Sequence, residues 1–543
     1  MYNSLKEYIN YLDSIGELTT IEEFTDPIYE ITRLTDIESK KANGGKALLF
    51  KNTGTEFPVV TNIMGSEKRM NLVLGIKKWE EIDQKINVFF NELKKEHSGI
   101  QSKLKLIPKL AQAAKWFPKK FKGKAPCQEI VIDCNSKEVL SKLPILKCWP
   151  EDGGRFITFP LVHTIDKENG GRNLGMYRMQ VFDEVTTGMH WHRHHTGARH
   201  YEQYKDGKMP IAVAIGGDPI YTYSATAPLP DGIDEYILAG FFRNKPVELT
   251  DCLTQPIQVP ADCDFVIEGY IDTKEEKLYE GPFGDHTGFY SLADYYPAFH
   301  VTCLTHRKDA IYPATIVGIP PMEDKYIAMA TEKIFIHPLK MTIAPEIEDL
   351  FIPEEGTGHN FAVVKINKTY PGQGQKIAYA LWGAGQMMLT KFILVVSGDK
   401  VSDIRDYTQL NQAIKDNYHP ERDTFITKGP LDILDHTSPI CGFGGKMCID
   451  ATEKSVEELA SENSELPIKR GTKPSNVFCF TKIAYIDVLL DRECDTYEAL
   501  WLLGGNCDPL RDSYFENDSL VLDGRIKKNL EGFKRDWPNE VKF

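Results

Sequence analysis

FVIEGYI (265–271) and AFHVTCLTH (298–306) belong to a series of short apolar runs between residues 126 and 320, with Gly and Pro turns between them. The other members are EIVID, FPLVHTI, YRMQVF, PIAVAIG, QPIQVPA and YPATIVGI. Short runs of β-branched and aromatic residues between turn residues are typical of β-strands. A long succession of such strands predicts a closed or partly closed β-barrel for this part of the chain.

The first 125 residues have the pattern of an α/β domain. Ser4 and Glu7 form a capping box at the start of a helix whose apolar residues recur on one face. A second helix is expected to open at Asp26 and Pro27, and the apolar runs ALLF and PVVTNI follow it as strands. The apolar side of this second helix consists of Ile28, Ile31 and Leu34.

Three further segments complete the predicted organisation. Residues 103–125 are basic and broken by prolines, which predicts a connecting arm to the barrel of residues 126–320. Residues 321–345 are expected to form a linker helix. Strands and helices alternate again over residues 346–543, which predicts a C-terminal α/β domain.

The C-terminal domain contains two similar segments. TKFILVV…HPERD (390–423) resembles TKIAYIDVLLDRECDTYEALWLLGGNCDPLRD (481–512), and the motifs IDATEK and LDGRIKK follow at comparable distances. A partial internal repeat and a chance resemblance of two β-α units are both open interpretations.

The composition excludes several functional classes. The 543 residues include 64 basic and 78 acidic side chains, and the net charge of −14 argues against electrostatic binding of nucleic acid or anionic lipid. No stretch has the apolar length of a membrane span, and the N-terminus lacks the layout of a secretory signal. The 11 cysteines are scattered and never spaced CxxC, which indicates neither a disulfide framework nor a cysteine zinc site. We therefore expect a cytoplasmic protein with reduced thiols.

Arg178 lies in NLGMYRMQV (173–181), where strand alternation places Tyr177 and Met179 on one face and Arg178 on the other. An arginine on the inner face of a barrel needs an anion, and its planar fork binds a carboxylate through two hydrogen bonds. A substrate carboxylate is therefore one interpretation of this arginine. An outward, solvated side chain is the other.

GMHWHRHHTGARH (188–200) contains five histidines. On an extended strand His190, His192 and His194 share a face. Such a cluster predicts a zinc or iron site, because neutral imidazole binds both metals. Since one ion cannot take all five, the others would hydrogen-bond a phosphate or a ring, or lie exposed.

Glu235 lies in DGIDEYILAGFF (231–242), which predicts a helix capped at Asp231 with apolar residues on most sides of the glutamate. A carboxylate in such surroundings needs a cation or an arginine partner. An exposed helical glutamate is the alternative.

EGPFGDHTGFY (280–290) holds Glu280 and Asp285 at a fixed separation, because its three glycines and one proline dictate a backbone path that can approach a ligand closely. Two carboxylates on one rigid turn suit acid–base chemistry. In a dry pocket one has a raised pKa and donates a proton, while the other stays ionised against Arg178. A calcium loop would need more acidic ligands at alternating positions.

Six motifs together closely resemble the UbiD family of reversible decarboxylases, which use prenylated FMN. They are NLGMYR, MHWHRHHTGA, PLPDGIDEY, EGPFGDHTGFY, MLTKF and GGKMCIDAT. The resemblance covers nearly the whole chain. It implies an N-terminal α/β domain, a central flavin-reductase-like split β-barrel that holds the cofactor, and a C-terminal α/β domain that forms a homo-oligomer, dimer or hexamer.

The resemblance also implies roles for individual residues. Arg178, Glu280 and Asp285 match the family's catalytic arginine and two acids. Asn173, His194 and Glu235 match the ligands of a divalent metal, Mn²⁺ or Mg²⁺, that ties the flavin phosphate to the protein. A potassium ion is expected near Ser224. The segments that line the flavin match Met176, Tyr177, His190, Trp191, His192, His195, Thr196 and Pro228, and Lys391 matches a lysine that pairs with the flavin phosphate.

The expected reaction is the reversible, non-oxidative decarboxylation of an aromatic or α,β-unsaturated carboxylic acid, in quinone or aromatic metabolism. Arg178 would orient the substrate carboxylate, ionised Glu280 would hold Arg178, and protonated Asp285 would deliver the proton. The expected partners are the acid substrate, CO₂ and a UbiX-type flavin prenyltransferase, with no nucleic acid and no membrane span. The alternatives are a flavin-independent, metal-dependent hydrolase built on the histidines and a non-catalytic subunit of a carboxylase complex.

Overall fold

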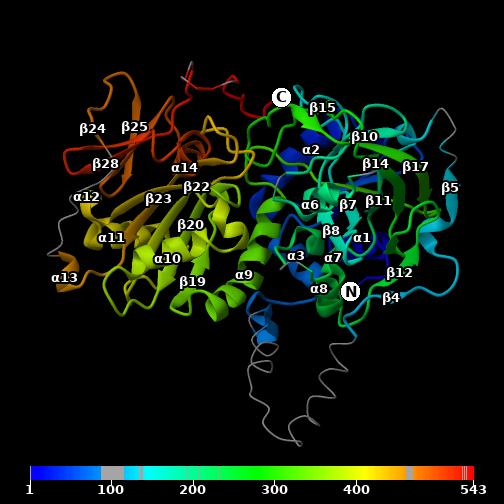
Figure 1. The fold of residues 1–543 in the computed structure, drawn as a ribbon, viewed down its shortest axis with the longest axis horizontal. Coiled ribbons are helices and arrows are strands. Elements are labelled where there is room, and N and C mark those ends of the chain that lie inside the picture. The colour runs from blue at the N-terminus through cyan, green and yellow to red at the C-terminus, as the bar shows by residue number, and fades with distance from the viewer. Residues whose placement is uncertain are drawn as a thin grey trace, which may run out of the picture. The chain divides into compact units, whose positions relative to one another are not determined.

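The computed structural model describes residues 2–543 except 83, 87–114, 133, 135–137, 193, 206, 230–231, 460–468, 529, 531 and 534. The chain forms two compact units, Met1–Ile327 with Val541–Phe543 and Ala328–Glu540 (Figure 1). Both units combine helices with several sheets, so the fold is mixed α/β. Among the described residues, no helix is long and apolar enough to cross a membrane. Most of the predicted connecting arm, residues 103–114, lies outside the described residues.

The structure confirms the helix predicted to start after Ser4. α1 (Leu5–Ser14) follows Ser4, whose hydroxyl accepts a hydrogen bond from the backbone N–H of Glu7 at 3.1 Å. The Glu7 carboxylate accepts in turn from the N–H of Asn3 at 2.8 Å, one residue before the position that a capping box uses.

The second helix starts later than predicted. α2 (Glu30–Ser39) begins after a turn in which the Asp26 carboxylate accepts a hydrogen bond from the N–H of Ile28 at 2.8 Å. Ile31 is buried as predicted, but Leu34 is 37% exposed. The predicted start and the predicted place of Leu34 are therefore wrong, because the local side-chain bond of Asp26 closes a turn in place of the first helical turn.

A four-stranded sheet in the first unit contains the predicted strands ALLF and PVVTNI. β1 pairs parallel with β2, β2 antiparallel with β3, and β3 parallel with β18. The last strand comes from YPATIVGI, so this run does not join the sheet that contains FVIEGYI and AFHVTCLTH. The strands are β1 (Leu18–Phe24), β2 (Ala47–Asn52), β3 (Val59–Thr61) and β18 (Tyr312–Ala314).

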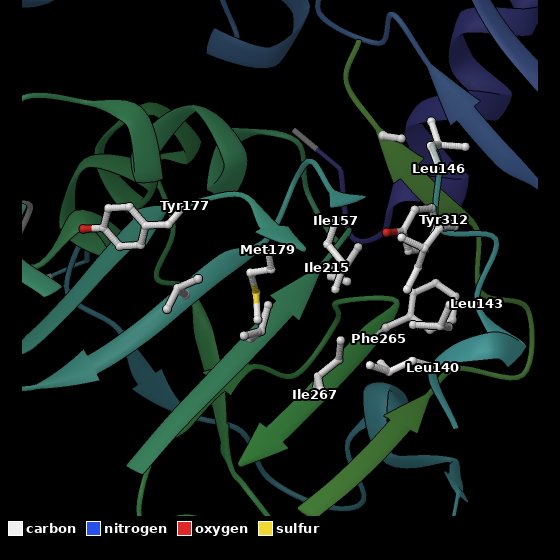
Figure 2. Packing of buried hydrophobic residues seen from close by; sticks show 14 of the residues in the cluster. Leu140, Leu143, Leu146, Ile157, Tyr177, Met179, Ile215, Phe265, Ile267 and Tyr312 are labelled. Carbon is white, nitrogen blue, oxygen red and sulfur yellow. The ribbon is translucent and has the colours of Figure 1, made fainter. Parts of the chain in front are cut away.

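The central sheet has seven strands in the order β10-β17-β14-β11-β7-β8, and β5 pairs with β17 (Figure 1). All its strand pairs are antiparallel. One face carries alternate side chains into a large core, and Figure 2 shows Ile215, Phe265 and Ile267 there beside Leu140 and Leu143. The strands are β5 (Ile130–Ile132), β7 (Leu161–Ile165), β8 (Arg172–Met176), β10 (Thr186–Gly188), β11 (Lys208–Ile215), β14 (Phe265–Asp272) and β17 (Ala298–His306).

Smaller elements surround this sheet. β15 (Leu278–Glu280) and β16 (Asp294–Tyr296) form a hairpin, and β6 (Phe156–Ile157) pairs with β9 (Met179–Gln180). QPIQVPA forms β13 in a separate sheet, β13-β12-β4. The remaining elements of this unit include α3 (Glu67–Leu74), β4 (Lys119–Lys120), α6 (Thr196–Gln203), α7 (Ile220–Thr226), α8 (Glu235–Arg243), β12 (Glu248–Asp251) and β13 (Gln258–Pro260). α9 (Asp324–Thr342) begins in the first unit and ends in the second.

The second unit contains two five-stranded sheets, in the orders β19-β20-β21-β23-β22 and β24-β27-β28-β26-β25. The strands of the first are β19 (Ile347–Phe351), β20 (Phe361–Ile366), β21 (Phe392–Ser397), β22 (Thr424–Pro430) and β23 (Phe443–Ala451). Those of the second are β24 (Lys469–Arg470), β25 (Phe478–Ile483), β26 (Ile486–Leu490), β27 (Ser513–Glu516) and β28 (Ser519–Asp523). The helices are α10 (Gln373–Trp382), α11 (Tyr407–Asn417), α12 (Pro420–Asp423), α13 (Val456–Leu459) and α14 (Thr496–Asn506).

The two sheets contain equivalent segments. In the first, β21 is followed by helix and then by the antiparallel pair β22-β23, and β23 returns parallel to β21. In the second, β26 is followed by helix and then by the antiparallel pair β27-β28, and β28 returns parallel to β26.

Side-chain contacts repeat in the same way at the motifs HPERD and DPLRD. The final aspartate of each motif accepts a hydrogen bond from the N–H four residues earlier and pairs with the arginine before it. These contacts are His419 N to Asp423 at 2.7 Å, Asp508 N to Asp512 at 2.9 Å, Arg422–Asp423 at 2.7 Å and Arg511–Asp512 at 2.5 Å. Shared topology and shared contacts favour the internal repeat over chance resemblance.

Candidate active site

Arg178 lies between β8 and β9, and its neighbours Tyr177 and Met179 are both buried in the large core (Figure 2). Arg178 itself packs against Glu280 and Asp285, and its side chain is only 10% exposed. Strand alternation predicted this separation correctly. The alternative of an outward, solvated arginine is wrong.

The guanidinium of Arg178 is held on several sides. Nη1 forms an ion pair with the Asp285 carboxylate, and Nη2 donates to Ser291 Oγ at 2.9 Å. Nε lies 3.5 Å from Glu280 Oε1. The ring of Phe283 covers one face, with its centroid 4.8 Å from Arg178 Cζ. The orientation of the guanidinium plane is therefore strongly constrained.

The loop that carries the two acids is anchored by two residues that we did not identify from the sequence. Gln180 Oε1 accepts from the N–H of Gly281 at 2.7 Å, and Asp152 Oδ1 accepts from the N–H of Gly284 at 2.8 Å. Gly281 has a φ of +98°, which favours glycine. Gln180 shares a strand face with Arg178, so alternation could have indicated it. Asp152 is 132 positions from Gly284 and has no such signal.

Glu280 ends β15, and its side chain is fully buried. Burial raises its pKa to about 7, although the Arg178 charge acts in the opposite direction. Oε1 hydrogen-bonds His190 Nδ1 at 2.7 Å, whereas Oε2 has no hydrogen-bond partner among the described residues. A Cβ atom at Gly188 would lie 2.3 Å from Oε2, so glycine at that position leaves room for the carboxyl group.

The pKa of Asp285 is shifted in the opposite direction from that of Glu280. Burial acts to raise its pKa, but the Arg178 charge and the hydrogen bonds from His286 outweigh burial and hold the pKa below its usual range. The pKa of Asp285 is thus shifted down and that of Glu280 up, the opposite of the directions expected for an ionised Glu280 and a protonated Asp285, because Asp285 makes the closer ion pair with Arg178.

The histidine segment does not form the predicted extended strand. His190 Nε2 lies 2.6 Å from His192 Nε2, but the chain then turns, and the N–H of His195 donates to His192 O at 3.0 Å. His194 is exposed, and the ring of His195 stacks on that of His192 instead. The prediction that His194 shares a face with His190 and His192 is wrong. In the described parts of the chain, no group of three or more His, Cys, Asp or Glu residues could hold a metal ion.

Glu235 is the first residue of α8, and its side chain faces a cavity of about 350 Å³. The helix is capped by Asp234, which accepts from the N–H of Tyr236 at 2.9 Å; the predicted cap, Asp231, lies outside the described residues. Burial raises the pKa of Glu235 to about 7. The other polar residues around the cavity include Asn173, Thr196, Arg172, Arg199 and His200, and His194 is not among the lining residues.

The other predicted residues are dispersed. Ser224 is buried in α7, and within the described structure its hydroxyl has no hydrogen-bond partner. Trp191 is buried against Gly197, while Met176 and Pro228 are partly exposed. Lys391 is buried in the second unit, where its ammonium lies 2.5 Å from Asp435 and donates to the carbonyl oxygens of Gly504 and Cys507 at 2.8 and 3.2 Å.

Three family models match this chain. They describe the N-terminal, Rift-related and C-terminal domains of 3-octaprenyl-4-hydroxybenzoate carboxy-lyase and match residues 9–87, 119–320 and 325–451. The matches define the protein as an enzyme of the carboxy-lyase class. The chain belongs to the UbiD family.

This chain is also similar to other proteins and to solved structures. An uncharacterized protein of Archaeoglobus fulgidus is 45% identical over 462 residues, which cover 84% of this chain and 93% of the relative. The vanillic acid decarboxylase of Sedimentibacter hydroxybenzoicus in closed form has a TM-score of 0.72 at 25% identity and covers 88% of this chain and 96% of its own. The UbiD-class enzyme HmfF from Pelotomaculum thermopropionicum in complex with FMN has a TM-score of 0.69 at 24% identity, with coverages of 86% and 97%.

Proposed function

We propose that this enzyme catalyses the reversible, non-oxidative decarboxylation of an aromatic or α,β-unsaturated carboxylic acid with prenylated FMN and a divalent cation. The observation that carries the proposal is the buried Arg178 between Glu280 and Asp285. Membership in the carboxy-lyase family supports it over the alternatives of a hydrolase and a non-catalytic subunit.

Arg178 is suited to bind the substrate carboxylate. A guanidinium has five N–H donors, and the described hydrogen bonds to Asp285 and Ser291 use two of them. A substrate carboxylate can bind the remaining donors or replace Asp285. Phe283 covers one face of the guanidinium, and Asp285 and Ser291 occupy two of its N–H donors, so the donors that remain restrict the orientation of the bound acid.

Glu280 is suited to move the proton. With a pKa of about 7 it keeps a proton up to near-neutral pH, and its Oε2 makes no hydrogen bond among the described residues. Ionised Asp285 holds the Arg178 guanidinium in place. Prenylated FMN, when bound, supplies the electron sink for loss of CO₂.

The cavity beside α8 fits the phosphate end of such a cofactor. Asn173 and Glu235 offer an amide oxygen and a carboxylate, the hard oxygen ligands that Mn²⁺ and Mg²⁺ accept. A cation there would stabilise the ionised form of Glu235, which burial alone disfavours. Arg172 and Arg199 line the same cavity and would attract a phosphate.

Further parts of the proposal rest on the family resemblance. We propose that the seven-stranded sheet is the core of a split β-barrel, that His194 completes the metal site and that the unpartnered hydroxyl of Ser224 contributes to a potassium site. We also propose that a UbiX-type prenyltransferase supplies the cofactor and that the enzyme acts as a homo-oligomer in the cytoplasm.

Production of the protein together with a flavin prenyltransferase tests the function. We expect a coloured protein whose bound cofactor has the mass of prenylated FMN, and which exchanges labelled CO₂ into members of a panel of aromatic and α,β-unsaturated acids. Protein produced without the prenyltransferase is the control and should not exchange. A colourless protein with hydrolytic activity would contradict the proposal.

Replacement of Glu235 by Gln tests the metal site. The substitution keeps the size of the side chain and removes the charge, so we expect the apparent affinity for Mn²⁺ to fall by about 10-fold to 100-fold or more, at least the effect of losing an outer-shell partner. Metal content and bound flavin are measured together after dialysis against graded Mn²⁺. The control is Glu168→Gln, which changes an exposed glutamate. Equal Mn²⁺ retention in both variants would contradict the assignment.

A further inference from the structure

The amide group of Asn173, one of the proposed metal ligands, has a hydrogen-bond partner on the neighbouring strand. Asn173 of β8 pairs in register with Thr164 of β7, and its Nδ2 donates to Thr164 Oγ1 at 3.2 Å. Both side chains are buried. Asn173 also lines the cavity beside α8 together with Glu235. Because the amide nitrogen faces Thr164, the amide oxygen is the end that remains for the cavity.

The orientation of this amide decides whether Asn173 can bind a cation. An amide oxygen is a ligand for Mn²⁺ or Mg²⁺, whereas an amide nitrogen carries two N–H donors and cannot bind either ion. The opposite orientation would require Thr164 to donate its hydroxyl proton to Asn173 Oδ1. The Tyr177 hydroxyl, a further partner of Asn173, can donate or accept and does not choose between the two orientations. The choice therefore depends on where the hydroxyl proton of Thr164 points.

His200 is the second partner of the Thr164 hydroxyl. It lies in the last turn of α6, and its Nδ1 is 2.9 Å from Thr164 Oγ1. Its other ring nitrogen, Nε2, lies 3.8 Å from Asp166 Oδ2.

Asp166 favours one tautomer of this histidine. Its Oδ1 accepts hydrogen bonds from the N–H groups of Glu168 and Asn169 at 2.8 and 3.1 Å. These bonds lower the pKa of Asp166, so its carboxylate is ionised at neutral pH. A negative charge near Nε2 favours a proton on that nitrogen and leaves Nδ1 of His200 as an acceptor.

We propose that Thr164 and His200 are positioning residues for the metal ligand Asn173. His200 Nδ1 accepts the hydroxyl proton of Thr164, so Thr164 can only accept from the Asn173 amide, and the amide oxygen is directed to the cation. A hydroxyl has one proton, which is why donation to His200 excludes donation to Asn173 Oδ1. This inference rests on the proposed metal site of Asn173 and Glu235, and it assigns residues that orient a ligand without binding the ion.

A matched pair of variants at Thr164 tests the orientation. Thr164→Val keeps the shape of the side chain and removes its oxygen, whereas Thr164→Ser keeps the oxygen. Flavin-loaded proteins are dialysed against graded Mn²⁺, and metal content and melting temperature are measured. We expect Thr164→Val to bind Mn²⁺ about 10-fold to 100-fold more weakly than the wild type, the usual effect of losing an outer-shell partner. Thr164→Ser should recover most of this loss.

A double-mutant cycle tests whether His200 acts through Thr164. His200→Phe keeps a ring on α6 but offers no acceptor, so it should weaken Mn²⁺ binding in the presence of Thr164. In the Thr164→Val background no hydroxyl is left to orient, and the same substitution should have little further effect on Mn²⁺ affinity. An effect of His200 that does not pass through Thr164 would be the same in both backgrounds.

Glu235→Gln, measured in parallel, separates this proposal from that of the metal site. If Glu235→Gln weakens Mn²⁺ binding and Thr164→Val lowers only the melting temperature, Thr164 has a structural role alone and the metal site stands. If the effects of Thr164→Val and His200→Phe on Mn²⁺ affinity add, the proposed role of His200 is wrong. If none of these variants changes Mn²⁺ affinity, the metal site and the positioning residues are both wrong.

Discussion

Replacement of Glu280 by Gln is expected to lower kcat by about 10²–10⁴-fold, the usual effect of removing a positioned general acid. Gln keeps the size of the side chain and its oxygen at the place of Oε1, so His190 and Arg178 keep an acceptor. It cannot donate the proton that replaces CO₂. Single-turnover measurements with protein loaded with prenylated FMN test the chemical step, and wild-type turnover in the variant would exclude Glu280 as the donor.

The pH dependence provides an independent check of the same residue. Wild-type kcat is expected to fall as the pH rises through about 7, because Glu280 loses its proton there.

The folded protein also holds this proton more tightly than the unfolded chain, in which a glutamate carboxyl has its ordinary pKa of 4.5. The stability contributed by Glu280 is therefore complete below pH 4.5 and is lost as the pH rises through about 7. Glu280→Gln removes this loss, so above pH 7 the variant should melt no lower than the wild type.

Replacement of Arg178 by Gln is expected to have the largest effect overall, a loss of about 10²–10⁴-fold or more in kcat/KM. The variant loses the donors for the substrate carboxylate and leaves Asp285 buried without its ion-pair partner. Breaking a buried pair in this way costs roughly 3–5 kcal/mol of stability. Steady-state kinetics and thermal melts measure the two losses separately.

Two companion variants separate binding from stability. Arg178→Lys keeps a positive charge near Asp285 but lacks the planar fork, so it should be more stable than Arg178→Gln and still poorly active. Arg178→Gln combined with Asp285→Asn removes both charges, and it should recover stability without activity. If the double variant recovered turnover, Arg178 would have only a structural role.

The stability of Arg178→Gln should depend on pH differently from that of the wild type, because Asp285 loses its ion-pair partner. In the wild type the pKa of Asp285 lies below its unfolded value, so its contribution to stability is present above the unfolded pKa and lost as the pH falls. Without Arg178, burial is opposed only by the contacts of His286, so this pKa rises. The melting temperature of the variant should then rise on acidification relative to that of the wild type.

The fold shows which sequence signals are reliable. The capping residue Ser4 predicted the start of α1 correctly, because its bond to Glu7 involves only neighbouring residues. The start of α2 was wrong because a single side-chain bond from Asp26 shifted it. YPATIVGI was correctly expected to be a strand, but its partner β3 could not be predicted, since apolar content does not specify which edge a strand joins.

Some features of the candidate site were likewise predicted correctly from the sequence, and others were not. Alternation around Arg178 predicted that Tyr177 and Met179 enter the core and that Arg178 faces the other side. The wrong prediction for His194 came from assuming an extended segment, whereas the turn after His192 reverses the chain. Asp152, which anchors Gly284, lies far away in sequence and only the folded chain brings it there.

By itself the sequence of this protein determined which reactive side chains and motifs are present: an arginine, two acids on a glycine-rich loop, and the motifs of the UbiD carboxy-lyases. Those features depend on residue types and on spacing along the chain. The tertiary structure decided which acid lies closer to Arg178, in which direction burial and charge shift the pKa of each acid, and that His190 contacts Glu280. A pKa depends on burial and on the distances between charges, and both exist only once strands that are distant in sequence have packed together.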